Sequence, residues 1–390
     1  MKRILILDAN QRSALSVTRS LGKHNIPIIT AESSATSLAG CSRYTLNHFQ
    51  YPDPATQPEQ FINFISKLAQ DHNIQIIFPM TELTTTLLLE NKNKFGDIVL
   101  PFPELSTINS ISDKCKLMNR AELLNIPIPH TWHEDNPTEM KASLDNLKYP
   151  LVLKPGKSWI KQNEKWFHTL VKFAENPSSA RDILSKDPAF SAHPFMLQKC
   201  VSGAGQGIFA LYNQGEAIAF FSHHRIREKP YWGGVSVLSE SISIDPTMLS
   251  YSRKLLDAVH WHGIAMVEFK VSDEGIPYLM EINTRFWGSL QLAVDAGVDF
   301  PWLLYKIATG EHVEPVKQYK EGIRLRWILG DLDSLYIRLK DNNLTLTNKF
   351  VSLLKFLNPN PFKTRHEVNR LHDMKPFWFE LKQYFKELIR

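Results

Sequence analysis

Short apolar runs alternate with amphipathic stretches over residues 1–110. Strand-sized runs occur in "RILILD", "IPIIT" and "IQIIFP", and between the first two Leu15, Val17 and Leu21 recur at near-helical spacing. A second helical stretch, "PEQFINFISKLAQDH", precedes the third run. Strands that alternate with helices are typical of a parallel sheet, so this region is predicted to be a small α/β domain.

The turn after the first apolar run reads "DANQRS" and contains no G-x-G-x-x-G. Those glycines let the backbone approach a pyrophosphate closely. We therefore expect a Rossmann-like domain without the dinucleotide-binding fingerprint.

A second unit begins at "SISDKCKLM", where Ser112 or Asp113 can cap a helix that runs to about Leu124. From about residue 150, alternating strands are joined by turns at 213–215 and 273–275, the pattern of antiparallel hairpins, and one helix is expected over 246–260. The pattern after Gly310 is helical to the last residue. The predicted units are residues 1–110, residues 111–315 with a lid at about 130–198, and a basic helical region over 316–390.

Composition places the chain among globular proteins, with 43% hydrophobic and 22% charged residues. No apolar run approaches the roughly 20 residues that cross a bilayer, and no signal-peptide pattern opens the chain, so we expect a cytoplasmic protein.

The three cysteines of the chain lack pair spacing, which argues against a disulfide framework and a CxxC zinc site. The positive charges over 316–390 are mixed with acidic and apolar residues, which favours a solvated helical surface over a nucleic-acid site.

The stretch "YLMEINTRFWGS" sets Glu281, Asn283 and Arg285 at alternate positions, so an extended strand would point all three to one face. Glu268 lies in the strand before the "DEG" turn and can face them across the hairpin. Two carboxylates and an amide oxygen suit Mg²⁺, and Arg285 can bind the same phosphates, which predicts a Mg²⁺-ATP site. The alternative is an ordinary exposed Glu–Arg pair on a sheet surface.

The segment "VEFKVSDEGIPYLMEINTRFWGSLQLAVDAGVDFPWLL" resembles the end of an ATP-grasp domain, similar to those of biotin carboxylase and carbamoyl phosphate synthetase. The resemblance covers about residues 1–315. It implies an ATP-grasp fold in which Glu268, Glu281 and Asn283 hold Mg²⁺ (or Mn²⁺) and Arg285 stabilises the transferring γ-phosphoryl group.

The same resemblance implies the remaining nucleotide contacts. Lys154 in "YPLVLKPG" and Lys114, the first lysine in "SDKCKLM", would contact ATP. The hinge in "MLQKCVSG" would hold adenine through its backbone. The hinge residues are Gln198, Lys199 and Val201. Where related domains carry a ribose-binding Glu, "GAGQG" offers Gln206 alone.

Two further stretches are unusual, and the first of them departs from the family pattern. The phosphate loop "KPGKSWIKQNEKW" is poor in glycine, so Lys157 and Lys161 are either phosphate ligands or solvated loop lysines. In "SHHRIREKPYWGG", Arg225 and Arg227 are expected to share a face with His223 and to hold a carboxylate or acyl phosphate. Adjacent histidines point to opposite faces of a strand, so a zinc site at His223 and His224 is not favoured.

The resemblance implies an ATP-dependent carboxylate-amine ligase with small-molecule carboxylate and amine substrates. Carboxyphosphate or carbamoyl phosphate chemistry and a non-catalytic ATP-binding regulator are the alternatives. No nucleic-acid partner is expected, and a homodimer is possible. The substrate pocket is expected near "DANQRS", "PMTE" and "HHRIREKPYWGG".

Overall fold

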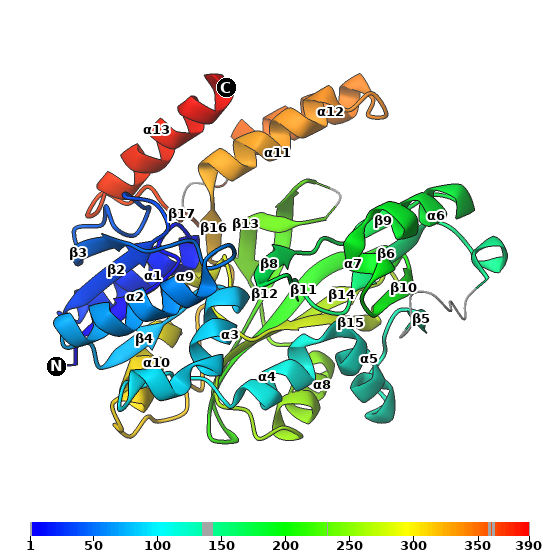
Figure 1. Cartoon of the computed structure of the whole chain (residues 1–390). Helices are drawn as coiled ribbons and strands as arrows, with labels where there is room; N and C mark the ends of the chain where they lie inside the picture. The colour runs from blue at the N-terminus through cyan, green and yellow to red at the C-terminus, as the bar shows by residue number, and fades with distance from the viewer. Residues whose placement is uncertain (1, 135–142, 232, 358–359, 361–362, 390) are drawn as a thin grey trace.

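The computed structural model describes residues 2–134, 143–231, 233–357, 360 and 363–389. Three of the four sheets lie along the molecule, with the N-terminal sheet at one end, the lid sheet at the other and a large, mainly antiparallel sheet between them (Figure 1). This arrangement confirms the predicted combination of α/β and α+β parts. The predicted lid, 130–198, includes residues 135–142, which lie outside the described residues.

The N-terminal sheet is parallel throughout, in the order β3-β2-β1-β4. Its strands are β1 (Ile4–Ile6), β2 (Ile28–Glu32), β3 (Thr45–Gln50) and β4 (Ile76–Phe78). Helices of this region are α1 (Arg12–Lys23), α2 (Pro58–Asp71) and α3 (Glu82–Glu90), with a short 3₁₀ turn at Lys92–Phe95. The Rossmann-like prediction is confirmed. Strand β3 was not predicted, because it is a half-exposed edge strand whose "TLNHFQ" lacks an apolar run.

The lid is a four-stranded sheet in the order β5-β10-β6-β9, covered by two short helices. Its elements are β5 (Thr131–Glu134), β6 (Leu151–Pro155), β9 (Lys172–Ala174), α6 (Pro177–Lys186), α7 (Pro188–Ser191) and β10 (Phe195–Lys199), with a 3₁₀ turn at Leu144–Asn146. Helices α4 (Leu105–Ser112) and α5 (Lys114–Leu123) precede it. The side chain of Asp113 caps α5 by accepting from the amides of Cys115 and Lys116, as its position before the helix predicts.

The large sheet has seven strands in the order β15-β14-β11-β12-β13-β16-β17. The five long strands are β11 (Ala204–Asn213), β12 (Glu216–Lys229), β13 (Val235–Ser241), β14 (Gly263–Val271) and β15 (Pro277–Asn283). Helices α8 (Pro246–Asp257), α9 (Leu290–Ala296) and α10 (Phe300–Ala308) pack around it. Both predicted hairpin turns are present, and Phe78 of β4 packs edge-on against Phe286 after β15, which joins the N-terminal sheet to the large one.

The prediction of a purely helical C-terminal region is wrong. Three helices are present, α11 (Ile328–Lys340), α12 (Leu346–Leu357) and α13 (Lys375–Ile389), but β16 (Arg324–Arg326) and β17 (Thr364–His366) extend the large sheet. Each strand is three residues long and carries two basic residues, so neither has an apolar pattern that the sequence reveals. Among the described residues, no helix combines the length and apolar content needed to cross a bilayer.

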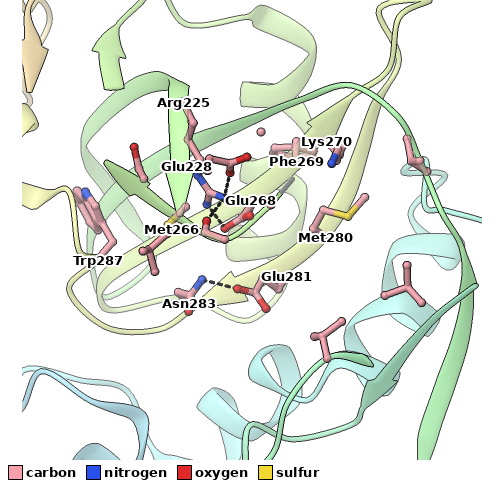
Figure 2. Close-up of a pocket in the computed structure, with 18 of the residues that line it drawn as sticks. Arg225, Glu228, Met266, Glu268, Phe269, Lys270, Met280, Glu281, Asn283 and Trp287 are labelled. Carbon is pink, nitrogen blue, oxygen red and sulfur yellow. Dashed lines mark hydrogen bonds and ion pairs between the residues drawn. The ribbon is translucent and has the colours of Figure 1, made fainter. Parts of the chain in front are cut away.

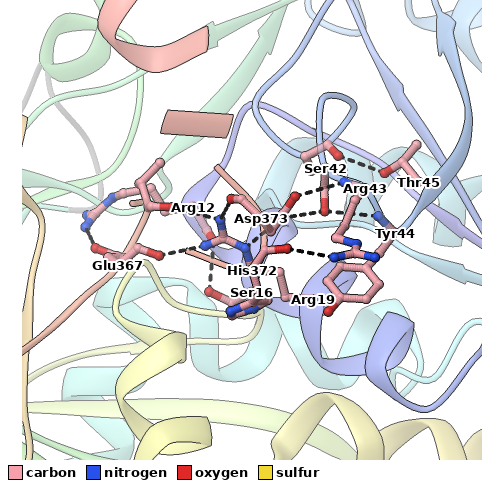
Figure 3. A network of polar contacts seen from close by, with 12 residues as sticks. Arg12, Ser16, Arg19, Ser42, Arg43, Tyr44, Thr45, Glu367, His372 and Asp373 are labelled. Carbon is pink, nitrogen blue, oxygen red and sulfur yellow. Dashed lines mark hydrogen bonds and ion pairs between the residues drawn. The ribbon is translucent and has the colours of Figure 1, made fainter. Parts of the chain in front are cut away.

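Buried ion pairs attach the segment before α13 to the N-terminal domain (Figure 3). Arg19 of α1 donates to Asp373 Oδ2 at 2.9 Å, and both side chains are almost fully buried. Ser42 Oγ donates to the same carboxylate at 2.8 Å, and Arg12 pairs with buried Glu367. Removing one partner of such a pair leaves a buried charge uncompensated, so these contacts fix the position of α13 on the domain.

Candidate active site

A cavity of about 530 Å³ lies between the lid sheet and the large sheet. Nine of the twelve predicted site residues line it. They are Lys154, Gln198, Lys199, Val201, Arg225, Glu268, Glu281, Asn283 and Arg285. The strands of the two sheets therefore bring together residues that are up to 131 positions apart in the sequence, between Lys154 and Arg285.

The acidic centre of the cavity is formed by one hairpin. Glu268 on β14 is paired directly with Glu281 on β15, so both side chains are on the same face of the sheet (Figure 2). Asn283 Nδ2 donates to Glu281 Oε1 at 2.9 Å, which leaves the amide oxygen of Asn283 as an acceptor. Arg285 also lines the cavity, but it follows the end of β15 and does not continue the strand.

Two cations compensate these carboxylates. Lys114 Nζ lies 3.4 Å from Glu281 Oε2, and Arg225 Nη2 lies 2.6 Å from Glu268 Oε2. Burial raises the pKa of Glu268. The positive charge of Arg225 acts to lower this pKa, whereas the negative charge of Glu281 acts to raise it further. Burial also acts to raise the pKa of Glu281, but the Lys114 charge and the Asn283 hydrogen bond outweigh it and lower the pKa to about 2. Glu281 is therefore an anion at neutral pH.

The two carboxylates and Asn283 fit a hard divalent cation. Mg²⁺ prefers oxygen ligands and keeps several sites for phosphate oxygens or water, and a cation would relieve the repulsion between Glu268 and Glu281. No group of three or more His, Cys, Asp or Glu is arranged around a metal position within the described part of the chain. The protein would thus supply few ligands, as is usual for a metal bound together with a nucleotide.

The two predicted phosphate lysines come from different elements, β6 and α5. Lys154 on β6 is buried, its ammonium group donates to Met280 Sδ at 3.9 Å, and burial lowers the pKa of this group to about 8. Lys114 is the first residue of α5, and its ammonium group also donates to Ser158 Oγ at 3.3 Å. Lys114 is not among the residues that line the cavity, and it reaches the site through Glu281.

The hinge strand β10 supplies the residues predicted to bind adenine. Gln198 is buried, and its Nε2 donates to Thr131 Oγ1 at 2.9 Å while its Oε1 has no partner within the described structure. The amide of Lys199 donates to the carbonyl of His130 at 3.0 Å, and Lys199 lines the cavity. Val201 follows the strand and lines the cavity.

Gln206 does not line the cavity, so the structure does not place it at the ribose. On β11 it is paired with His224, whereas its neighbour Gly207 is paired with His223, which does line the cavity. Because directly paired residues share a face, Gln206 points to the opposite face of the sheet. Gly205 occupies the cavity side instead.

Arg225 and Arg227 have different surroundings in the structure, since Arg225 lines the cavity and Arg227 does not. Arg225 and His223 line the cavity as predicted, but the pairing of β12 with β13 shifts on both sides of Arg227. Such irregularities change the face to which a side chain points. Arg227 instead makes two hydrogen bonds of 2.7 and 2.6 Å to buried Asp331 of α11, so the prediction that both arginines share one face is wrong.

These contacts predict different consequences for the two arginines. We expect Arg227→Met to lower the free energy of unfolding by about 1–3 kcal/mol, because Asp331 loses one of its two arginine partners, while the KM values for substrates stay unchanged. Arg225→Met should instead weaken the binding of an anionic substrate in the cavity and so raise its KM. Denaturant unfolding and steady-state kinetics of both variants test this, and a raised KM for an anionic substrate in the Arg227 variant would contradict the assignment.

His223 is a packed neutral side chain. Its ring stacks on Phe209 with centroids 4.5 Å apart, and its Nε2 is 2.8 Å from Ser289 Oγ. Burial, with a smaller effect of the Arg225 charge, lowers the pKa of His223 to about 3. It therefore adds no charge to the cavity at neutral pH.

The glycine-poor loop after Lys154 forms a hairpin of β7 (Trp159–Gln162) and β8 (Lys165–His168). Lys161 is exposed and pairs with Glu164 at 2.9 Å, which fits the solvated-lysine alternative. Lys157 is exposed too, and neither lysine lines the cavity.

Sequence reasoning missed three charged residues of the lining, Arg12, Glu228 and Lys270. Glu228 accepts from Arg225 Nη1 at 3.0 Å and so shares this cation with Glu268 (Figure 2). Arg12 reaches the cavity from the start of α1. The spacing of Arg225 and Glu228 in "RIRE" offered a signal, but which side of β12 each occupies depends on the irregular pairing.

Comparisons with known proteins identify similar sequences and folds. Residues 191–330 match the family described as "ATP-grasp in the biosynthetic pathway with Ter operon", and they include Glu268, Glu281, Asn283 and Arg285. No curated protein sequence matches the chain.

Three solved structures are similar to the chain at low sequence identity. A biotin carboxylase from Campylobacter jejuni in a complex with β,γ-ATP has a TM-score of 0.63 and 18% identity, over 83% of this chain and 74% of that one. An L-amino acid ligase from Bacillus licheniformis has a TM-score of 0.62 and 14% identity, over 81% and 78%. The biotin carboxylase domain of a 2-oxoglutarate carboxylase from Hydrogenobacter thermophilus, with MgADP and bicarbonate, has a TM-score of 0.58 and 16% identity, over 83% and 72%.

Proposed function

We propose, because the chain has the ATP-grasp fold, that it is an ATP-dependent ligase that activates a carboxylate as an acyl phosphate and joins it to an amine. The fold confirms the resemblance read from the sequence motifs. The substrates and the joining reaction are the part that is proposed.

The observation that carries the proposal is the set of charged residues in one cavity. Glu268 and Glu281 are paired across a hairpin, Lys154 approaches from the lid, and Arg285 follows the same hairpin. Each of these charges is costly to desolvate, so a bound ligand of matching charge is the physical reason to gather them in one cavity. The arrangement suits the triphosphate of a nucleotide and the charge that develops when its γ-phosphoryl group moves.

Each residue has a role in this scheme. Glu268, Glu281 and Asn283 would hold Mg²⁺, which when bound neutralises the phosphate oxygens. Lys154 and Arg285 would position the triphosphate, and the lid sheet with the hinge would enclose the nucleotide. Arg225, held by Glu228 and Glu268, is placed to contact an anionic substrate.

The proposed reaction has two steps. A carboxylate oxygen of the substrate attacks the γ-phosphorus, and ADP leaves with the electron pair of the broken P–O bond. The amine nitrogen then forms a bond to the acyl carbon, the carbon–oxygen bond to phosphate breaks, and inorganic phosphate leaves while the amine loses one proton. The protein contributes orientation and charge stabilisation, because the covalent changes occur between the substrates.

Carboxyphosphate chemistry is the second candidate, because two of the similar structures are biotin carboxylases and one of them contains bicarbonate. The two candidates differ in the first substrate. ATP-dependent phosphate release with organic acids, in buffer freed of bicarbonate, supports the ligase. Release that requires bicarbonate alone supports the alternative.

The direct test is to trap the activated acid. The full chain is mixed with ATP, Mg²⁺, hydroxylamine and a panel of carboxylic acids, and hydroxamate formation is measured together with ADP. A ligase of this type should form hydroxamate and ADP in equal amounts with at least one acid. If no acid and no bicarbonate stimulates ATP turnover, the proposed function is wrong.

Mg²⁺-ATP should also stabilise the folded protein. A ligand at about 100 times its Kd, bound by the folded state alone, adds about 2.7 kcal/mol, so the melting temperature should rise by about 2 °C or more. The measurement is thermal unfolding with ATP in the presence of Mg²⁺ and, as the control, with ATP and a chelator. An equal shift in both would contradict a metal site at Glu268 and Glu281.

A further inference from the structure

A second cavity, of about 660 Å³, adjoins the candidate active site. Arg12 and Val235 line both cavities, so the two spaces meet at these side chains. One wall is formed by the loops after β1 and β2, and the other by α13, the C-terminal helix that lies beside the N-terminal domain (Figure 1). This helix lies outside the residues that match the known family.

The wall formed by α13 is acidic and polar. Glu380, Gln383 and Glu387 are spaced by three and four residues, so they lie on one face of the helix, and all three line the cavity. Across from them are the polar side chains of the loops, Asn10, Gln11, Ser34 and Thr36. The space is therefore built for a polar ligand.

The positive charge in this lining is already neutralised. Arg12 pairs with buried Glu367 (Figure 3), and its guanidinium lies 4.0 Å from the ring centre of Trp327. Arg12 is the one Lys or Arg among the described residues that line the cavity. An anionic ligand would thus find no free cation there, and it would meet two carboxylates.

Glu380, by contrast, has no cation as a partner. Its Oε1 accepts from Trp327 Nε1 at 2.7 Å, and no ion pair to it occurs among the described residues. Burial raises the pKa of this carboxyl to about 7. A partly buried carboxylate without a cation is costly, and a positively charged ligand would remove that cost.

We propose that this second cavity binds the amine substrate, and that this amine carries a second, cationic group that Glu380 recognises, as in a diamine. The proposal rests on the proposed ligase function, because it names the class of the nucleophile. The attacking nitrogen must be uncharged, whereas the second ammonium group stays protonated and can pair with Glu380. Glu387, at the exposed end of the same face, adds a weaker attraction.

The test compares two ligands that differ in one group. The full chain, with Mg²⁺ and ADP, is titrated by calorimetry with 1,4-diaminobutane and with 4-amino-1-butanol, in which a hydroxyl replaces one ammonium. We expect the diamine to bind about tenfold tighter or more, which is the size of one charge-assisted contact. Glu380→Gln should abolish most of this preference, and Glu59→Gln, an exposed position on α2, should keep it.

The outcomes separate this proposal from the ligase function. Equal binding of the two ligands to the unchanged protein, no binding of the diamine, or an unchanged preference in the Glu380 variant would overturn the amine site. The hydroxamate assay does not require the amine, so it reports carboxylate activation independently. If Glu380→Gln also abolished hydroxamate formation, Glu380 would serve the activation step or the fold, and the amine site would be rejected.

Discussion

Replacing Glu281 by Gln should reduce ATP turnover by roughly a hundredfold to a thousandfold while the fold is retained. The substitution keeps the shape of the side chain but removes one negative charge from the proposed metal site. It also leaves Lys114 without its carboxylate partner at 3.4 Å, so the site becomes more positive and binds a divalent cation less well. The measurements are steady-state ADP release and calorimetric titration with Mn²⁺ in the presence of ADP.

The same hairpin offers a matched control. Glu274 lies in the exposed turn between β14 and β15, so Glu274→Gln removes an identical charge without touching the cavity. We expect its turnover and metal affinity to match the unchanged protein. If Glu281→Gln turned over normally, the ordinary surface-pair alternative for Glu281 would be the correct one.

Lys154→Met should weaken ATP binding by about tenfold to a hundredfold, the value of a charge-assisted contact to phosphate. Methionine keeps most of the apolar stem that packs in β6, and it removes a buried ammonium group whose pKa is already lowered to about 8. The variant should therefore fold at least as stably as the unchanged protein. Calorimetric titration with Mg²⁺-ATP and denaturant unfolding measure the two effects separately.

Lys161→Met is the control for this change. Its ammonium group is exposed and paired with Glu164, and it does not line the cavity, so ATP affinity should be nearly unchanged. If both variants lost ATP affinity equally, the two lysines would act through the general positive potential of the lid. If only Lys161→Met lost ATP affinity, the hairpin after Lys154, and not the buried lysine itself, would hold the triphosphate.

The C-terminal region has more influence on the site than its charge pattern suggested. Asp331 of α11 holds Arg227 on the outer side of β12, which leaves Arg225 as the arginine of this pair that faces the cavity. The ion pair between Arg19 and Asp373 fixes the start of α13 against the N-terminal domain, next to the second cavity. Contacts between residues more than 300 positions apart in the chain thus hold together the segments around the second cavity.

The sequence by itself determined the parts of the site that depend on neighbouring residues. A register shift between Glu268 and Phe269 sets Glu268 directly against Glu281, and only the structure shows that shift. The "DEG" turn, however, closes a hairpin, so the closeness of the two strands that carry these carboxylates could be predicted without a structure. The same holds for the helix cap at Asp113 and for the parallel N-terminal sheet, because capping and apolar periodicity act over a few residues.

Only the tertiary structure decided which charges meet across distant segments. Arg227 and Gln206 were assigned to the cavity from strand alternation, but bulges in β12 and the pairing of β11 turn them away, since a shift of one residue reverses the face of a side chain. The pairing of Lys114 with Glu281 depends on where α5 lies against β15, and the second cavity depends on where α13 lies against the N-terminal domain. Such positions result from the packing of whole elements, for which a local pattern of residues carries no signal.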